Sequence, residues 1–168
     1  MKKLLISALI LLTLGVNMLY AKSMEMYDTD GNSYKINAVD NEFKIEGTEG
    51  KVVFLEFFGL NCPACREAMP HLINLKNKYK DKIRIMAIEV QKHDVDPINA
   101  YKKEHGINYT TFSNYDVGEI VRYIADNSGW KGAIPFTVVI DAKGIVQFVQ
   151  AGVISEEKLN EYVEQFSK

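Results

Sequence analysis

The chain has 168 residues, of which 47% are hydrophobic, and this is enough for one domain with a substantial core. Its formal net charge is −2, and a mildly acidic chain gives no support for nucleic-acid binding. It contains only two cysteines, three positions apart, which excludes the framework of several disulfides that stabilises many small exported domains.

The first 21 residues differ from the rest of the chain. Two lysines precede an apolar stretch from Leu4 to Val16, and the segment ends in a small residue, Ala21. This layout predicts a signal peptide over residues 1–21 and a mature domain over residues 22–168. Loss of the two lysines would change the formal charge from −2 to −4. The alternative is a retained membrane anchor, although the apolar run is slightly short for a membrane span.

The region before the cysteines predicts strands. Met24–Tyr27 and Tyr34–Ala38 lie on either side of a turn-rich segment, Asp28-Thr-Asp-Gly-Asn32, and this pattern indicates a β-hairpin. Residues 41–50 are polar with scattered apolar positions, and we expect a loop there. Lys51–Phe58 is continuously apolar apart from two charged residues, which is typical of a buried strand.

The two cysteines follow this strand in the sequence Cys62-Pro63-Ala64-Cys65, at the start of a segment with helical spacing that we expect to end near Tyr79. Proline is tolerated in the first helical turn, where its missing N–H has no partner to lose. Residues three apart on a helix have Cβ atoms about 5–6 Å apart, which is close to disulfide geometry. The pair can therefore open and close with little backbone movement.

Reactivity explains this pair better than structural stabilisation does. A bridge that closes four residues restrains almost none of the unfolded chain. The free N–H groups and the positive dipole end of the helix favour a thiolate on Cys62. We therefore predict a redox-active dithiol in which Cys62 is the nucleophile and Cys65 resolves the mixed disulfide.

The remainder of the chain alternates between strand and helix patterns, which predicts an α/β domain with a central sheet. The expected elements are a strand at Ile83–Val90, a helix from Asp96 to about His105, a short strand at Tyr109–Phe112, a helix at Val117–Ala125, a loop at Asn127–Gly132, a hairpin of Phe136–Ile140 and Ile145–Val149, and a final helix with Ser155 as its N-cap.

Two further residues are candidates for the site. Glu56 places a carboxyl inside the apolar strand, which is costly unless the group is neutral or paired. We predict a functional acid there, the alternative being a side chain that reaches out of the strand to solvent. Trp130 is the only tryptophan and precedes the segment that leads to Pro135. It could line the site or only pack beside it.

These features together resemble the thioredoxin fold. The cysteine pair follows the first central strand, Pro70 lies five residues after the second cysteine, and Ile134-Pro135 precedes the closing hairpin. In that family the equivalent proline has a cis peptide bond and faces the disulfide, so the resemblance places substrate contacts at Ile134 and Pro135. It also matches Glu56 to the buried aspartate that carries a proton for the second cysteine.

The chain is also similar to the exported TlpA/ResA/CcmG-type branch. The similarity lies in the DTDGNSYKI hairpin before the GKVVFLEFF strand, the insert between the two halves, and the closing IPFTVVIDAKGIV segment. It implies a central mixed sheet flanked by helices, with an N-terminal β-hairpin and a helical insert. This branch usually has tryptophan just before the first cysteine and asparagine six positions before it, where this chain has Asn61 and Glu56.

The function that this branch implies is that of a thiol-disulfide oxidoreductase in the periplasm, anchored to the inner membrane if the signal segment is retained. Its partners would be cysteine-containing proteins such as apocytochrome c and a membrane thiol-disulfide electron donor. No cofactor is needed, because the two sulfurs carry both electrons.

Two other functions stay open. The Pro63-Ala64 dipeptide begins with proline, as in some oxidising proteins, which would fit a DsbA-like oxidase or isomerase. Two thiols together with a histidine would form a soft-metal site for copper or zinc. We expect no metal there, because His71, His93 and His105 are expected on the solvated surface of the protein.

Overall fold

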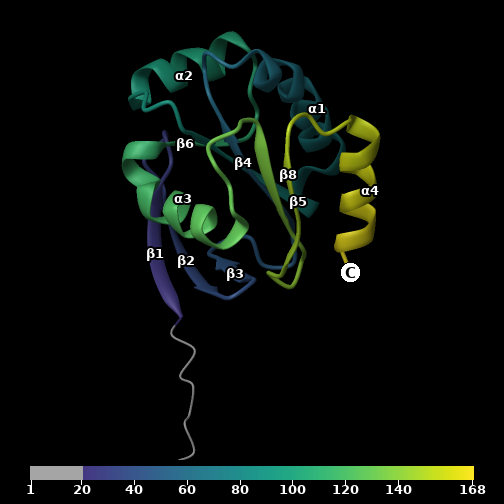
Figure 1. Cartoon of the computed structure of the whole chain (residues 1–168). Coiled ribbons are helices and arrows are strands. Elements are labelled where there is room, and N and C mark those ends of the chain that lie inside the picture. The colour runs from purple at the N-terminus through teal and green to yellow at the C-terminus, as the bar shows by residue number, and fades with distance from the viewer. Residues whose placement is uncertain (1–20) are drawn as a thin grey trace, which may run out of the picture.

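The computed structural model describes residues 21–168 (Figure 1). The segment predicted to be a signal peptide lies outside the described residues, apart from Ala21. Within residues 21–168, none of the helices combines the length and the apolar character that crossing a bilayer requires.

The described chain forms two sheets and four α-helices. Its elements are β1 (Lys22–Tyr27), β2 (Ser33–Val39), β3 (Glu42–Ile45), β4 (Val52–Phe58), α1 (Pro63–Tyr79), a short 3₁₀ helix (Lys80–Lys82), β5 (Ile83–Glu89), α2 (Val95–Glu104), β6 (Thr110–Ser113), α3 (Asn114–Ser128), β7 (Phe136–Ile140), β8 (Val146–Ala151) and α4 (Glu156–Phe166).

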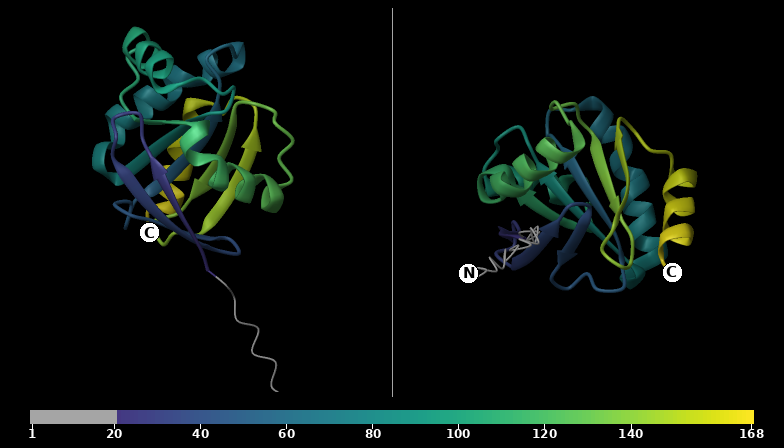
Figure 2. Two further views of the ribbon diagram at one scale, coloured as in Figure 1. Left: turned by 90° about the vertical axis from the view of Figure 1, so that its left-hand side faces the viewer. Right: turned by 60° about the horizontal axis from the view of Figure 1, so that its bottom comes forward.

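The central sheet has the strand order β6-β5-β4-β7-β8. β4 and β5 run parallel, as do β5 and β6, whereas β7 is antiparallel to both of its neighbours, β4 and β8. Helices α1 and α4 cover one face of this sheet, and α3 lies on the other (Figure 2). The predicted central mixed sheet flanked by helices is therefore confirmed, and β4 is apolar apart from Glu56 because both of its faces are covered.

The N-terminal hairpin is confirmed, but it belongs to a three-stranded antiparallel sheet of order β1-β2-β3. The loop expected over residues 41–50 is therefore wrong at its start, where β3 pairs with β2. Phe43 and Ile45 point inward and are buried, while Lys44 between them is exposed. Four residues are a short sample of this period-two pattern, and the polar residues on either side concealed it.

Helix α3 is longer than its apolar pattern predicts. It begins at Asn114, where the side chain of Ser113 accepts a hydrogen bond from the Tyr115 N–H. It ends at Gly129, whose φ of 71° is left-handed and suits the residue after a helix. The loop that was expected over Asn127–Gly132 therefore begins two residues later than predicted, at Gly129. The other helices lie within a residue or two of their predicted positions, and Ser155 caps α4 as expected.

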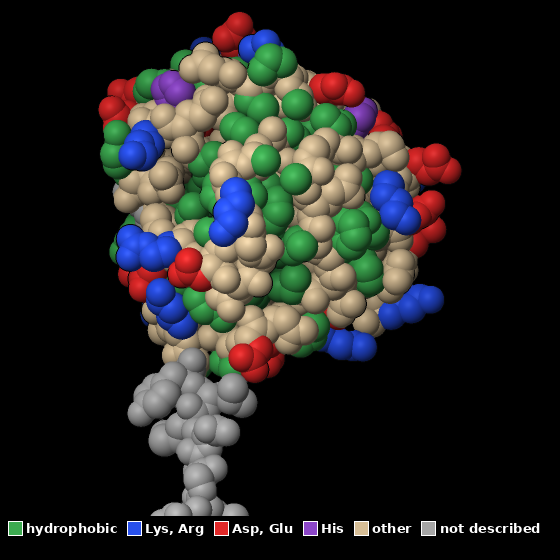
Figure 3. All heavy atoms as spheres, viewed as in Figure 1, with side chains coloured by type: hydrophobic (Ala, Val, Ile, Leu, Met, Phe, Trp, Pro, Cys, Tyr) green, Lys and Arg blue, Asp and Glu red, His purple; other side chains and the backbone are tan. Residues whose placement is uncertain are grey.

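One groove on the surface lies away from the cysteines. Apolar side chains gather along the middle of the face shown in Figure 3. A groove of about 500 Å³ lies between β3, α3, β7 and β8, and Phe43, Ile124 and Val149 are among its lining residues. Neither cysteine borders this groove.

Candidate active site

The two cysteines form a disulfide at the N-terminus of α1, with Cα atoms 5.2 Å apart. Cys62 is the N-cap residue, and its Sγ accepts a hydrogen bond from the Cys65 N–H at 3.1 Å. The first turn of α1 contains Pro63 and no acidic residue. The predicted location of the pair is thus confirmed. Both side chains are buried in the disulfide form, with exposed fractions of 6% for Cys62 and 3% for Cys65.

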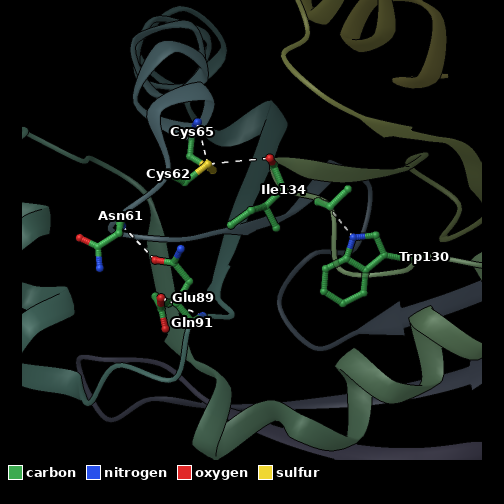
Figure 4. Close-up of a disulfide and its surroundings, with 8 residues drawn as sticks. Asn61, Cys62, Cys65, Glu89, Gln91, Trp130 and Ile134 are labelled. Carbon is green, nitrogen blue, oxygen red and sulfur yellow. Dashed lines mark hydrogen bonds between the residues drawn. A yellow bond between two sulfur atoms is a disulfide. The ribbon is translucent and has the colours of Figure 1, made fainter.

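The segment before β7 faces this disulfide. The peptide bond between Ile134 and Pro135 is cis, as the resemblance predicted. The carbonyl oxygen of Ile134 lies 3.8 Å from Cys62 Sγ (Figure 4), so a reduced Cys62 thiol is within reach of it as a hydrogen-bond donor. The carbonyl of Pro135 accepts a hydrogen bond from the Gly152 N–H at 2.8 Å. This bond fixes the segment to the end of β8.

Trp130 lies beyond Ile134 as seen from the disulfide (Figure 4). Its Nε1–H donates to the carbonyl of Ala133 at 2.6 Å. Its ring meets Phe57 edge-on, with centroids 4.7 Å apart, and lies 5.7 Å from the ring of Phe136. These contacts shape the segment that leads to the cis proline.

Glu56 lies in the centre of β4 with an exposed fraction of 3%. Its neighbours in register are Ala87 on β5 and Thr137 on β7. Burial raises the pKa of Glu56 from 4.5 to about 8, because the charged form loses its hydration. The alternative of a side chain that reaches solvent is therefore wrong.

A small cavity connects Glu56 with the cis proline. It has a volume of about 10 Å³, and Glu56, Pro135 and Ala68 are among its lining residues. Ala68 and Leu72, one and two helical turns beyond Cys65, line it from α1, so this cavity lies under the second and third turns of that helix. Its volume is at the lower limit for one water molecule. The fold thus brings the predicted acid beneath the helix that carries the dithiol.

Another buried carboxylate near the strand ends is Glu89, which the sequence pattern does not single out and whose exposed fraction is 0%. It ends β5 and accepts hydrogen bonds from the N–H groups of Gln91 and His93 and from His93 Nδ1, each at 2.9 Å. The carboxyl ends of parallel strands meet at one edge of a sheet, where sites tend to form. An acidic residue at the end of an apolar strand, next to the strand that leads to the cysteines, was the signal available.

The three histidines are not gathered around the cysteines. His71 lies 3.0 Å from the carbonyl of Ile154, His93 is bonded to Glu89, and His105 packs on the ring of Tyr101. Within the part of the chain that the structure describes, no group of three or more His, Cys, Asp or Glu side chains could hold a metal ion.

Comparison with known proteins places this site in context. The model of the AhpC/TSA family matches residues 21–149. The thiol-disulfide oxidoreductase ResA of Halalkalibacterium halodurans is 27% identical over 117 residues, which cover 69% of this chain and 62% of that protein. This chain thus spans less than two thirds of that relative's length. ResA of Bacillus subtilis is 23% identical over 144 residues, which cover 85% of this chain and 72% of that protein.

Solved structures show the same fold. A thiol:disulfide interchange protein of the thioredoxin family from Chlorobium tepidum has a TM-score of 0.69 and 22% identity, and the match covers 88% of this chain and 95% of that one. StoA from Bacillus subtilis has a TM-score of 0.62 and 13% identity, over 86% of this chain and 98% of that one. The expected thioredoxin fold is therefore confirmed.

Proposed function

This chain belongs to the AhpC/TSA family, and on that premise we propose that it is an exported thiol-disulfide oxidoreductase that reduces disulfides in selected proteins. The observation that supports this most directly is the cysteine pair at the N-cap of α1, facing the Ile134–Pro135 segment. The similarity to the ResA proteins supports the same reaction class.

The reaction begins with the Cys62 thiolate. It attacks one sulfur of the substrate disulfide, the substrate S–S bond breaks, and the other substrate sulfur leaves as a thiolate that takes up a proton. Cys65 then attacks Cys62 Sγ in the mixed disulfide and releases the second substrate thiol. The substrate gains two electrons and two protons, and the Cys62–Cys65 pair becomes a disulfide. A membrane thiol-disulfide donor would return the pair to its reduced form.

Glu56 is suited to accept the proton of Cys65. A pKa of about 8 is close to that of an ordinary thiol, about 8.5. Burial thus raises the pKa of Glu56 into the range in which thiols ionise, where a carboxyl can serve as a general base near neutral pH. Ile134, Pro135 and Trp130 form the side of the site on which we propose that the substrate chain binds, apocytochrome c being the candidate that the resemblance to the ResA-type branch suggests.

We expect the reduction potential of the Cys62–Cys65 couple to lie nearer that of thioredoxin, about −270 mV, than that of DsbA, about −120 mV. The N-terminus of α1 favours the Cys62 thiolate. However, no basic residue lies between the two cysteines. In addition, an ionised Glu56 would disfavour the negative charge of the thiolate. Equilibration with glutathione buffers measures this potential, and thioredoxin in the same buffers is the reference. A value above about −160 mV would instead support an oxidase or isomerase.

Two assays separate the remaining classes of function. The reduced protein should reduce a model disulfide such as that of insulin at a rate that depends on Cys62. Anaerobic titration of the reduced protein with Cu⁺ or Zn²⁺ tests the soft-metal alternative, and tight stoichiometric binding without reductase activity would favour it.

A further inference from the structure

A side chain from the segment after β5 holds the turn that precedes Cys62. The Oε1 atom of Gln91 accepts a hydrogen bond from the Asn61 N–H at 2.9 Å, across 30 positions of sequence (Figure 4). Asn61 is the residue immediately before the N-cap of α1, so its N–H has no partner within the helix. Gln91 therefore supplies an acceptor where the helix supplies none.

The buried carboxylate of Glu89 fixes the position of Gln91. Glu89 accepts hydrogen bonds from the backbone of Gln91 and from both the backbone and the ring of His93. The hydroxyl of Ser113 donates to the carbonyl of His93 at 2.9 Å, and the Val90 N–H donates to the carbonyl of Phe58. These hydrogen bonds tie the segment 90–93 to the ends of three adjacent strands, β4, β5 and β6. The segment is therefore held in place more firmly than a surface loop without such bonds.

Gly59 leaves the space that the Gln91 side chain occupies. A Cβ atom built on Gly59 would lie 2.4 Å from Cδ and 2.6 Å from Oε1 of Gln91. These distances are far below van der Waals contact, so any larger residue at position 59 must displace the amide group. Gly59 has no left-handed φ, which leaves this close approach as the reason for glycine at this position.

We propose that Gln91 is a positioning residue for Cys62, acting through the Asn61 amide. The hydrogen bond fixes the turn 59–61, and with it the placement of Cys62 Sγ against the Cys65 N–H, the group that stabilises its thiolate. This inference rests on the proposed function, in which Cys62 is the attacking thiol. The role of Gln91 is to keep the nucleophile preorganised between turnovers.

The test measures the alkylation rate of Cys62 in the fully reduced protein as a function of pH, using iodoacetamide and locating the label by peptide mapping. Gln91→Ala is expected to slow alkylation at pH 7 by about three- to tenfold, the effect of one ordinary hydrogen bond, and to move the midpoint of the pH profile upward. Gln91→Met keeps most of the side-chain volume without a strong acceptor, and is expected to behave like the alanine variant.

Gly59 provides a second, independent approach to the same contact. Gly59→Ala is expected to expel the Gln91 amide and to lower the alkylation rate by the same factor. Because both changes remove the same hydrogen bond, between Gln91 and the Asn61 N–H, the double variant should be alkylated no more slowly than either single variant. Gln147→Ala is the matched control. It removes a side-chain hydrogen bond of a glutamine to Asp141, at the opposite end of β7 from Pro135, and it should leave the alkylation profile unchanged.

Alkylation rates equal to wild type in Gln91→Ala and Gln91→Met would overturn the positioning role, as would effects of Gly59→Ala and Gln91→Ala that multiply. The measurement does not depend on reductase activity. If the wild-type protein fails to reduce insulin while the variants alkylate slowly as expected, the proposed function fails and the positioning role stands.

Discussion

Cys62→Ser is expected to lower disulfide reduction to the uncatalysed level, whereas Cys65→Ser is expected to form a mixed disulfide with its substrate and stop there. Cys62 is the N-cap residue of α1, where backbone N–H groups stabilise its thiolate. Cys65 lies one turn further into the helix and is needed only to release the substrate. Non-reducing electrophoresis with mass spectrometry would detect the trapped species.

Both variants should stay folded, because a bridge that closes so short a loop contributes little to the free energy of unfolding. Thermal unfolding of each variant therefore separates a chemical effect from a loss of structure. The double serine variant is the control for adventitious labelling and should trap nothing. Equal trapping by the two single variants would contradict the assignment of Cys62 as the nucleophile.

Local signals were sufficient to predict the position of the dithiol. The boundaries of α1 follow from the proline in its first turn and the apolar spacing behind it, and the structure has them at Pro63 and Tyr79. The cis peptide bond before Pro135 could be predicted only from the family resemblance, because nothing in the residues themselves distinguishes a cis bond from a trans one.

Long-range contacts account for what the sequence did not reveal. The bond between Asn61 and Gln91 joins residues on separate strand ends, and Glu89 reads in the sequence as the polar end of an apolar run. Strand β3 was missed because only its pairing with β2 distinguishes four residues from a loop. In each case the identity of the partner depends on the order of the strands in the folded sheet. The hydrophobic periodicity of the sequence predicts individual strands and helices but not this order.

The stability of the fold is expected to depend on pH through Glu56. The carboxyl has a pKa of about 8 in the folded protein and an ordinary value near 4.5 once unfolded. Between these two pH values the folded state binds a proton that the unfolded state has lost. Stability therefore falls as pH rises from about 4.5 to 8, by at most about 1.4 kcal/mol per pH unit.

Glu56→Gln removes this titration, because an amide is neutral at every pH. The free energy of unfolding of the variant, relative to wild type, should rise by on the order of 4 kcal/mol between pH 5 and pH 8. Chemical denaturation at several pH values measures this difference. A difference that does not change with pH would show that Glu56 does not titrate in this range in the folded protein.

The same substitution, which should stabilise the fold at high pH, should slow the resolution of the mixed disulfide. Without a base beneath α1, Cys65 must lose its proton to solvent before it attacks the mixed disulfide, and we expect turnover near pH 7 to fall by about tenfold or more. The deficit should shrink above about pH 9, where an ordinary thiol ionises unaided. Rapid-mixing measurements of mixed-disulfide resolution across this range test both statements. A gain in stability at pH 8 with unchanged turnover would mean that Glu56 is a buried acid that takes no part in proton transfer.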